Sequence, residues 1–544
     1  MATTVDPRED TGRHDRPVPP SPETDAPRSW RPDAGLLAVW ALTAAWAAAF
    51  SVLSVLRYRG FSTGRFDLGN MVQAVWSTSE GRFLDTTDVS GVQFSRLGAH
   101  VDPILALFVP LWWVWSSPEA LLVAQAVIVA LGALPAYWLG RRWLGDTRLA
   151  LAGAAVYLLL PAVQSATLFD FHPVTLAAPL LLWCIWAAEE GRWVVLTVCA
   201  GLALICQEQV GLLLVALAVW LWFRHPARRR AAVVLAVVSA TWVAVAIGVI
   251  MPHFALKGGN PHIGRYSRFG EGPTDILMTF VTRPWDVAEL VITPGRITYV
   301  LGLLLPLLLL PLAAPMLAAV ALPQLLINVF AAWGPAQSVH YHYAVLIAPV
   351  LVAASLLGLQ RLRTRPEGDP LRRLTSRSGW VAAAMVVAAI IPGIWQGPLP
   401  LWGWVPGGWG GSPLHAFTID ADARAIQCAV DLIPPGEPVS ATNDAGSHLS
   451  ARERIHLFPV LRDANWALVS DGRRAQGIAA DRPTLRPTIP LGIRPRSKLL
   501  QKDEKWDLIY VERGIRLYRR VASVPAGQPV DPRDQPGGPS RDCS

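Results

Sequence analysis

The sequence predicts a mostly α-helical protein, in which a polytopic transmembrane helix bundle is followed by a small C-terminal α/β domain. Of its 544 residues, 52% are hydrophobic and only 16% are charged, whereas soluble proteins carry about 25% charged residues. Long stretches hold almost no charge, among them 36–56, 121–140, 231–250 and 299–329. About 20 apolar residues cross a bilayer as a helix, so these stretches are expected to span a membrane.

Arginines set the predicted orientation of the bundle. Three short loops, 141–148, 224–230 and 361–377, hold thirteen arginines against three acids. Because basic residues of short loops stay in the cytoplasm, we place these loops on the cytoplasmic side of the membrane. The net charge of +8 is therefore no sign of nucleic-acid binding. The same rule puts the N-terminus inside and the C-terminal domain outside.

If each apolar run between the arginine-rich loops forms helices that span the membrane, the bundle has about 11 helices. They are expected at 35–57, 120–140, 149–167, 174–188, 193–206, 209–223, 231–251, 297–312, 313–332, 341–360 and 379–396. The apolar segment 103–115 is too short to span, and its tryptophans are typical of a helix lying on the outer leaflet.

Composition also divides the chain into domains. The polar N-terminal stretch and the Pro/Gly-rich C-terminal stretch are typical of disorder. After residue 417, helical spacing of apolar residues predicts a helix at 422–432, and strands are predicted at 438–442, 467–470, 506–511 and 515–519. The expected order is a cytoplasmic tail (1–34), the bundle (35–396) with outer loops 58–119 and 252–296, a linker (397–416), the extracytoplasmic domain (417–522) and a tail (523–544).

Polar residues gather on the predicted outer side. Nine of the eleven histidines fall there, together with the acids Asp67, Asp102, Asp170 and Glu208. A polar cluster at one face of a helix bundle is typical of an active site or a substrate path.

Each member of this cluster has a plain structural alternative. Asp67 precedes an amphipathic segment, so it is either an N-cap or a carboxylate held above the bilayer. His100 and Asp102 either share a phosphate or a divalent ion or form a turn before Pro103. Glu208 is either functional, as an acid at membrane depth usually is, or part of an exposed turn.

Two further motifs lie on the same side. Asp170 and His172 alternate with aromatic residues in Phe169-Asp170-Phe171-His172-Pro173, for which function and a simple helix break are equally favoured. His340 and His342 alternate with tyrosines just before the helix at 341–360. They offer imidazole donors to an anionic ligand, although tyrosines are also ordinary interface anchors.

Four short runs, in this order, resemble an uncharacterised bacterial membrane family, the one numbered 2079 among the domains of unknown function. They are Phe66-Asp67-Leu68-Gly69, Gly98-Ala99-His100-Val101-Asp102-Pro103, Phe169-Asp170-Phe171-His172-Pro173 and Glu208-Gln209-Val210-Gly211. The similarity covers about residues 35–350, and the C-terminal domain fits the family too. Family members often carry Lys-Glu-Asp where this chain has Gln207-Glu208-Gln209, which weakens a role for either glutamine but not for Glu208.

That family resembles in turn the GT-C superfamily of glycosyltransferases, which use a sugar on a polyprenyl phosphate rather than a nucleotide sugar. The shared plan is a helix bundle whose first outer loop carries an acid soon after the first helix, here Asp67. The resemblance implies a GT-C-like fold and transfer of a sugar from a polyprenyl-phosphate donor to an acceptor glycan, lipid or protein at the outer face.

Under this hypothesis Asp67 is the general base and Glu208 a second catalytic residue. The leaving phosphate needs cations or donors, and the candidates for binding substrate are Arg65, Arg96, His100, Asp102, Asp170, His172, Arg265, His340 and His342. A divalent cation, Mg²⁺ or Mn²⁺, at Asp67, His100 or Asp102 is left open. The alternatives are a transporter or lipid flippase with broken helices, and a non-enzymatic envelope sensor or scaffold.

Overall fold

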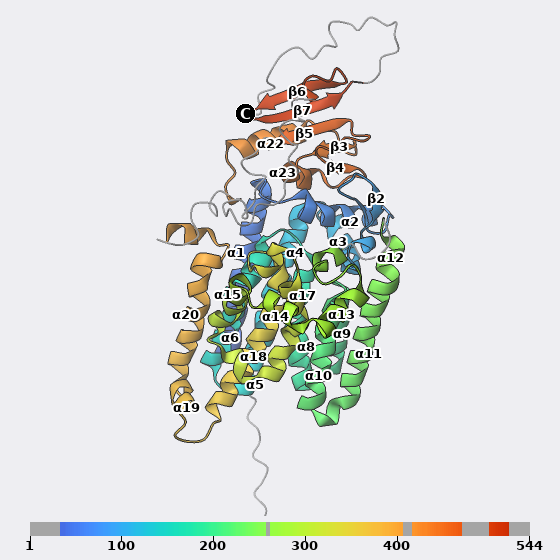
Figure 1. Ribbon diagram of the computed structural model, residues 1–544. Helices are drawn as coiled ribbons and strands as arrows, with labels where there is room; N and C mark the ends of the chain where they lie inside the picture. The colour runs from blue at the N-terminus through green and yellow to red at the C-terminus, as the bar shows by residue number, and fades with distance from the viewer. Residues whose placement is uncertain (1–32, 257–261, 406–415, 471–499, 522–544) are drawn as a thin grey trace, which may run out of the picture.

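The computed structural model describes residues 33–256, 262–405, 416–470 and 500–521. The predicted tails, 1–34 and 523–544, lie outside these ranges except for residues 33 and 34, and so does most of the predicted linker. Figure 1 shows a bundle of long helices with a small sheet stacked on one end. The predicted fold class, a mostly helical membrane bundle with a small C-terminal sheet domain, is confirmed.

The bundle contains helices long and apolar enough to cross a membrane. Within the described residues five qualify alone, at Ala34–Arg59, Pro118–Leu144, Pro226–Phe254, His342–Arg363 and Ser378–Gln396. A sixth candidate is the bent pair α6 and α7. All of the predicted helical ranges contain helix, whereas the number of crossings stays a prediction. The bounds are α1 Ala34–Arg59, α4 Pro118–Ala130, α5 Ala133–Leu144, α6 Thr147–Leu159, α7 Pro161–Leu168, α8 Pro173–Glu190, α9 Trp193–Leu204, α10 Val210–Arg224, α11 Arg229–Val245, α12 Met251–Phe254, α15 Pro294–Leu304, α16 Pro315–Ala318, α17 Leu322–Phe330, α18 Ile347–Arg363 and α20 Ser378–Gln396.

Prolines break three of the predicted helices. The expected helix 149–167 bends by 45° at Pro161, between α6 and α7. The two expected helices at 297–332 are a series of short helical pieces, with Pro306, Pro311 and Pro315 each near the start of one. Proline lacks the N–H that would continue the preceding turn and clashes with its carbonyl, so a run of apolar residues is not enough to keep these helices continuous.

The three basic loops meet at one end of the bundle. Glu189, at the end of α8, accepts hydrogen bonds from Arg142 at 3.4 Å and from Arg224 at 3.1 Å. These contacts join the 141–148 and 224–230 loops. The third loop, with α19 (Pro370–Thr375), lies at the same end in Figure 1, opposite the sheet. The arrangement agrees with the predicted topology, in which these loops share one side of the membrane.

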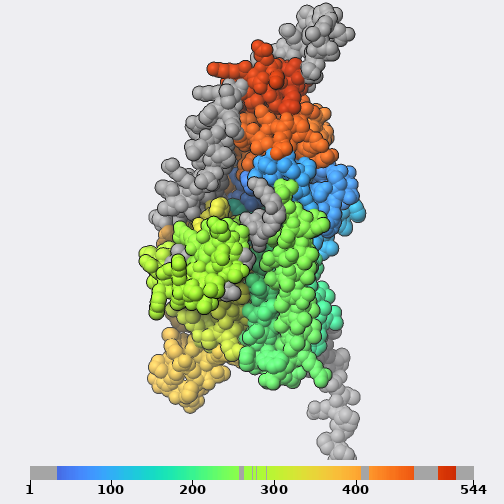
Figure 2. All heavy atoms as spheres, turned by 45° about the vertical axis from the view of Figure 1, so that its right-hand side comes forward, coloured from blue at the N-terminus to red at the C-terminus, as the bar shows by residue number. Residues whose placement is uncertain are grey.

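The first outer loop forms a layer between the bundle and the C-terminal domain, blue in Figure 2. It holds a π-helical turn, η1 (Arg65–Gly69), helix α2 (Asn70–Ser79) and a two-stranded ribbon, β1 (Asp85–Thr87) and β2 (Gln93–Ser95). The segment expected at 103–115 is the 3₁₀ helix η3 (Pro103–Phe108) followed by α3 (Val109–Val114). Trp113 is 68% exposed and Val114 87%, as expected for side chains that face lipid.

The second outer loop carries η6 (Ile263–Tyr266), α13 (Pro273–Thr282) and α14 (Pro284–Val291). Phe269 and Phe280 of this loop pack their rings against Phe330 at the end of α17, at centroid distances of 5.7 and 4.7 Å. This contact fixes η6, and the polar residues near it, beside the outer end of the bundle.

The C-terminal domain is a five-stranded mixed sheet with helix α22 (Ala421–Asp431) and a short helix α23 (Asn443–Gly446). The strand order is β4-β3-β5-β7-β6, in which β3 is parallel to β4 and β5. The strands are β3 Val439–Ala441, β4 Ile455–Leu457, β5 Trp466–Ser470, β6 Trp506–Glu512 and β7 Ile515–Arg520. The predicted helix and four predicted strands are present, whereas β4, three residues long, and the short helix α23 were not predicted.

Candidate functional site

Asp67 lies in the π-helical turn η1 and does not cap α2, whose N-cap is Gly69 without a side-chain hydrogen bond. Its Oδ1 instead lies 3.1 Å from Nε2 of His172, at the start of α8. The Asp67 side chain is 34% exposed and that of His172 is 7% exposed. The pair therefore joins the first outer loop to the α7–α8 loop, with its carboxylate accessible and its imidazole buried.

The hydrogen bonds of His172 determine where a proton resides. Its Nδ1 lies 3.0 Å from the carbonyl oxygen of Phe169, which only accepts, so Nδ1 carries hydrogen. The opposite nitrogen, Nε2, faces a carboxylate oxygen. A hydrogen bond across that contact requires one further proton, shared between His172 and Asp67. Oδ2 of Asp67 accepts no hydrogen bond from the part of the chain that the structure describes.

Gln125 of α4 holds the α7–α8 loop in place. Its Nε2 donates to the carbonyl oxygens of Thr167 and Asp170, at 3.0 and 2.7 Å, and its Oε1 accepts from the backbone N–H of His172 at 2.9 Å. Gln125 is fully buried. Gln125 was not predicted, although an amide in the middle of the apolar stretch 121–140 is a signal that could have identified it.

Asp170, which interacts electrostatically with Asp67, has a strained backbone conformation with φ +56°. Its Oδ2 accepts from the backbone N–H of Gly64 at 2.8 Å, whereas its Oδ1 is buried without a hydrogen-bond partner among the residues that the structure describes. Burial, followed by the negative charge of Asp67, raises the pKa of Asp170 to about 6. Strain and an unsatisfied buried carboxylate oxygen are typical of functional positions.

Glu208 forms a second cluster with His100. Its Oε2 accepts from the backbone N–H of Val101 at 3.0 Å, and its Oε1 lies 3.0 Å from Nδ1 of His100. Burial opposes ionisation, but His100 and these hydrogen bonds outweigh it and lower the pKa of Glu208 to about 2. Glu208 is therefore a buried anion rather than part of an exposed turn.

His262 completes this cluster and was not predicted. Its ring stacks on that of His100 at a centroid distance of 4.3 Å, and its Nε2 lies 2.9 Å from the carbonyl oxygen of Ala99. Burial, followed by the charge of His100, lowers the pKa of His262 to about 3. His262 is therefore a neutral donor at neutral pH.

Asp102 pairs with Arg96, whose Nη2 lies 2.7 Å from Asp102 Oδ2, and both side chains are buried. Burial raises the pKa of Asp102 although Arg96 and His100 oppose it. Arg96 is therefore already engaged by a carboxylate, and the pair supports the loop that carries His100.

His342 connects the two clusters. Its ring stacks on that of His172 at a centroid distance of 3.8 Å, and it interacts electrostatically with His172 and His100. His340 lies two residues before it in the same loop, where its backbone N–H donates to Ser338 Oγ at 3.2 Å. The two clusters and His342 thus bring together residues from five segments at the end of the bundle that bears the C-terminal domain.

The two remaining arginines differ in their surroundings. Arg265 of η6 acts electrostatically on His342 and His262 and has no ion-pair partner within the described ranges. Arg65 points away from this cluster, because its guanidinium donates to the carbonyl oxygens of Thr87 and Ile455. These contacts are structural, so we retain Arg265 and not Arg65 as a candidate for binding substrate.

The possible metal ligands do not converge. Asp67 pairs with His172, His100 with Glu208, and Asp102 with Arg96. No group of three or more His, Cys, Asp or Glu residues that could hold a metal ion exists among the residues that the structure covers. The arrangement does not fit a divalent ion shared by Asp67, His100 and Asp102.

A family model described as "Predicted membrane protein (DUF2079)" matches residues 57–506. The chain belongs to this family. The match confirms the resemblance carried by the four motifs and extends it through most of the C-terminal domain. DUF2079 describes a membrane protein, in agreement with the apolar helices.

Among curated proteins nothing matches this DUF2079 chain. Similar solved structures include ArnT from Cupriavidus metallidurans in the apo state, with 14% identity and a TM-score of 0.46, covering 90% of this chain and 100% of ArnT. The Archaeoglobus fulgidus oligosaccharyltransferase tethered with an acceptor peptide has 11% identity and a TM-score of 0.42, covering 78% of this chain and 69% of that one. The archaeal oligosaccharyltransferase AglB from Archaeoglobus fulgidus, in complex with an inhibitory peptide and a dolichol-phosphate, gives the same values.

Proposed function

We propose that this DUF2079 protein is an integral membrane glycosyltransferase that transfers a sugar from a polyprenyl-phosphate donor to an acceptor at the outer face of the cytoplasmic membrane. The observation that carries the proposal is the Asp67–His172 pair. It places an accessible carboxylate oxygen, backed by a buried imidazole, at one end of a lipid-embedded bundle. A donor with a long prenyl chain requires both a polar reaction site and an apolar bundle beside it.

Asp67 acts as the general base. The hydroxyl oxygen of the acceptor attacks the anomeric carbon of the donor sugar while Asp67 Oδ2 takes the hydroxyl proton. A new C–O glycosidic bond forms, and the bond from the anomeric carbon to the phosphate oxygen breaks. Polyprenyl phosphate leaves with that electron pair. His172 keeps Asp67 oriented through Oδ1, which leaves Oδ2 directed away from the imidazole.

The leaving phosphate gains negative charge, which favours a nearby cation in a site of low dielectric constant. Arg265 is suited to this role because it lacks a carboxylate partner among the described residues, and an arginine can bind a phosphate through two parallel hydrogen bonds. His342, stacked on His172, adds a second donor candidate on the same side. Glu208 holds His100 in place and does not take part in proton transfer.

The proposed orientation places the site and residues 416–521 outside the cell. It is supported by the position of the site at the end of the bundle opposite the three arginine-rich loops (Figure 1), because such loops stay in the cytoplasm. The donor and acceptor would then reach the site from the outer leaflet and the outer space.

A transporter or flippase is the second candidate, and the bend of 45° between α6 and α7 is the feature that favours it. Transporters place their substrate site near the bilayer midplane, between broken helices of two related halves. Asp67, His172 and Glu208 gather instead at one end of the bundle, which favours chemistry at a surface over passage through the membrane.

The lipid that co-purifies with the protein tests the proposal. We expect mass spectrometry of the purified Asp67→Asn protein to detect a polyprenyl-phosphate glycoside, because this variant binds the donor but cannot use it. Wild-type protein should carry less glycoside and more free polyprenyl phosphate. If neither form of the lipid accompanies either protein, the proposed donor class is wrong.

A further inference from the structure

The short segment that leads into Asp67 lies between the bundle and the C-terminal domain. On the bundle side, the backbone N–H of Gly64 donates to Asp170 Oδ2 at 2.8 Å. On the domain side, the backbone N–H of Phe66 donates to Asn443 Oδ1 of α23 at 3.0 Å. Asp67 is the next residue, so its position depends on contacts made from two sides.

Side chains and glycines bring this segment into close contact with the domain. Thr63 Oγ1 lies 3.0 Å from Ser447 Oγ. A Cβ atom on Gly64 would lie 2.8 Å from Asn443 Nδ2, and one on Gly446 would lie 2.6 Å from Arg65 Cβ. The Asn443 amide at the end of its side chain could move aside, whereas Arg65 Cβ is fixed to the backbone of η1, and real Cβ atoms essentially never approach other atoms so closely. Glycine at position 446 therefore allows η1 to pack closely against α23.

Arg65 adds a buried contact between the same two parts. Its side chain is almost fully buried, and its Nη2 donates to the carbonyl oxygen of Ile455 in β4 at 3.0 Å. The same guanidinium donates to Asn70 Oδ1 in α2 at 3.1 Å and to the carbonyl oxygen of Thr87 in β1. One residue, two positions before Asp67, thereby joins the turn η1, the ribbon and the sheet of the C-terminal domain.

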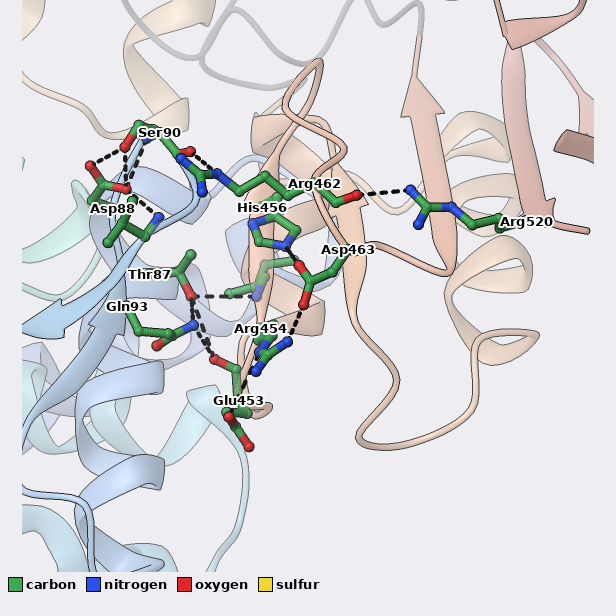
Figure 3. A network of polar contacts seen from close by, with 12 residues as sticks. Thr87, Asp88, Ser90, Gln93, Glu453, Arg454, His456, Arg462, Asp463 and Arg520 are labelled. Atoms are coloured by element: carbon green, nitrogen blue, oxygen red, sulfur yellow. Dashed lines mark hydrogen bonds and ion pairs between the residues drawn. The ribbon is translucent and has the colours of Figure 1, made fainter. Parts of the chain in front are cut away.

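The docked area extends well beyond this segment. Figure 3 shows its rim, where Gln93 donates to the carbonyl oxygen of Glu453 at 2.7 Å and Arg462 donates to that of Ser90. Elsewhere, the ring of His448 lies between those of Tyr58 and Phe61, at centroid distances of 4.0 and 3.8 Å. Phe61 belongs to the hydrophobic core of the C-terminal domain, so undocking the domain would expose part of that core.

We propose that the C-terminal domain is part of the catalytic apparatus, because it fixes the position of Asp67, and that Asn443 is the positioning residue. The proposal rests on the function proposed above. Catalytic groups must be held close to their productive geometry, and a displacement of about 1 Å can cost about 10²-fold in rate. The domain supplies that restraint from 377 positions away in the sequence.

Asn443→Ala tests the proposal, with Asn465→Ala as the matched control. Asn465 is an exposed asparagine of the same domain whose side chain donates to Glu437 Oε2 at 2.7 Å. In Asn443→Ala we expect faster hydrogen–deuterium exchange in the peptide spanning 62–69 of the full-length protein. We also expect turnover to fall by about 10–100-fold, followed in cells as accumulation of polyprenyl-phosphate glycoside.

Asn443→Asp keeps an oxygen that accepts from Phe66 and should restore both values, whereas Asn465→Ala should change neither. Unchanged exchange in Asn443→Ala would overturn the positioning role even if the protein is a glycosyltransferase. Raised exchange, together with full turnover in Asp67→Asn, would instead refute the proposed function and leave the docking contact intact.

A cross-link between Thr63→Cys and Ser447→Cys gives a second test that does not depend on the stability of Asn443→Ala. The two side-chain oxygens are 3.0 Å apart, so the cysteines should form a disulfide without moving the backbone. We expect the oxidised protein to keep the turnover of the reduced one. If oxidation stops turnover and reduction restores it, the domain has to move during the reaction, and fixed positioning is wrong.

Discussion

Nε2 of His172 lies 3.1 Å from Oδ1 of Asp67, although 105 positions separate the two residues. Each belongs to a different family motif, one after α1 and the other between α7 and α8. Their contact brings the two motifs together in space. It also changes the role expected of His172, from a substrate contact to the partner that orients a carboxylate.

The first prediction concerns this pair acting as a unit. Asp67→Asn keeps the shape of the side chain but removes the base, and it should lower turnover by about 10²–10⁴-fold. His172→Gln should also lower turnover, because it leaves Asp67 without its orienting partner. The double variant should lose little more than Asp67→Asn alone, since residues that act together are non-additive.

Asp422→Asn provides the control, because Asp422 forms an exposed ion pair with Arg513 in the C-terminal domain. It should leave turnover unchanged. If the losses from Asp67→Asn and His172→Gln simply multiplied in the double variant, the two residues would be acting independently, contrary to the geometry.

The second prediction concerns Glu208. Glu208→Gln keeps an oxygen that accepts from Val101 but removes the charge that faces His100, and should destabilise the protein by about 1–3 kcal/mol at neutral pH. Because the pKa of Glu208 is lowered from 4.5 to about 2, its stabilisation is present above pH 4.5 and is lost as the pH falls toward 2. Thermal unfolding in detergent at pH 7 should show the lower melting temperature. A variant as stable as wild type but without turnover would assign Glu208 to the chemistry instead.

The third prediction concerns the pH dependence that Asp170 confers. Its pKa is raised from 3.8 to about 6, so the stabilisation associated with its protonated form is complete below pH 3.8 and is lost as the pH rises through 6. Asp170→Asn is neutral at every pH and still accepts from Gly64. Its melting temperature relative to wild type should therefore rise by a few degrees between pH 4 and pH 7. Parallel melting curves for the two proteins across this range would contradict the shift.

The fourth prediction concerns topology. A reporter that is active only when exported, fused after residue 420, should be active, and one fused within the 361–377 loop should be inactive. Both follow from the arginine distribution. Activity with the opposite pattern would place the site in the cytoplasm and exclude a donor in the outer leaflet.

Much of the fold followed from the sequence because the bilayer constrains it strongly. Apolar length alone located the helices, and arginines alone grouped the loops that Glu189 joins. Most strands of the C-terminal domain followed from the alternation of apolar and polar residues. Prolines such as Pro161 and Pro306 were underestimated, since apolar composition does not report a break. The strand β4 is too short to give a periodic signal.

The site was less predictable, for physical reasons. Motifs identified Asp67, His172 and Glu208, but not which of them pair, because pairing depends on how distant loops pack. Gln125 stood out only as an amide in an apolar stretch, and His262 acts through a hydrogen bond and stacking that leave no pattern in the sequence. Arg65 shows the converse error, since a basic residue beside a catalytic candidate was expected to bind substrate and instead holds two domains together.

The most direct test of the central claim measures the donor lipid in cells. A strain lacking the protein would be complemented with wild type, Asp67→Asn or Asp422→Asn, and its polyprenyl-phosphate glycosides quantified by mass spectrometry at matched protein levels. We predict that wild type and Asp422→Asn lower the glycoside pool, while Asp67→Asn leaves it as high as in the strain without the protein. A pool that falls equally with Asp67→Asn would contradict the claim that this carboxylate carries out the transfer.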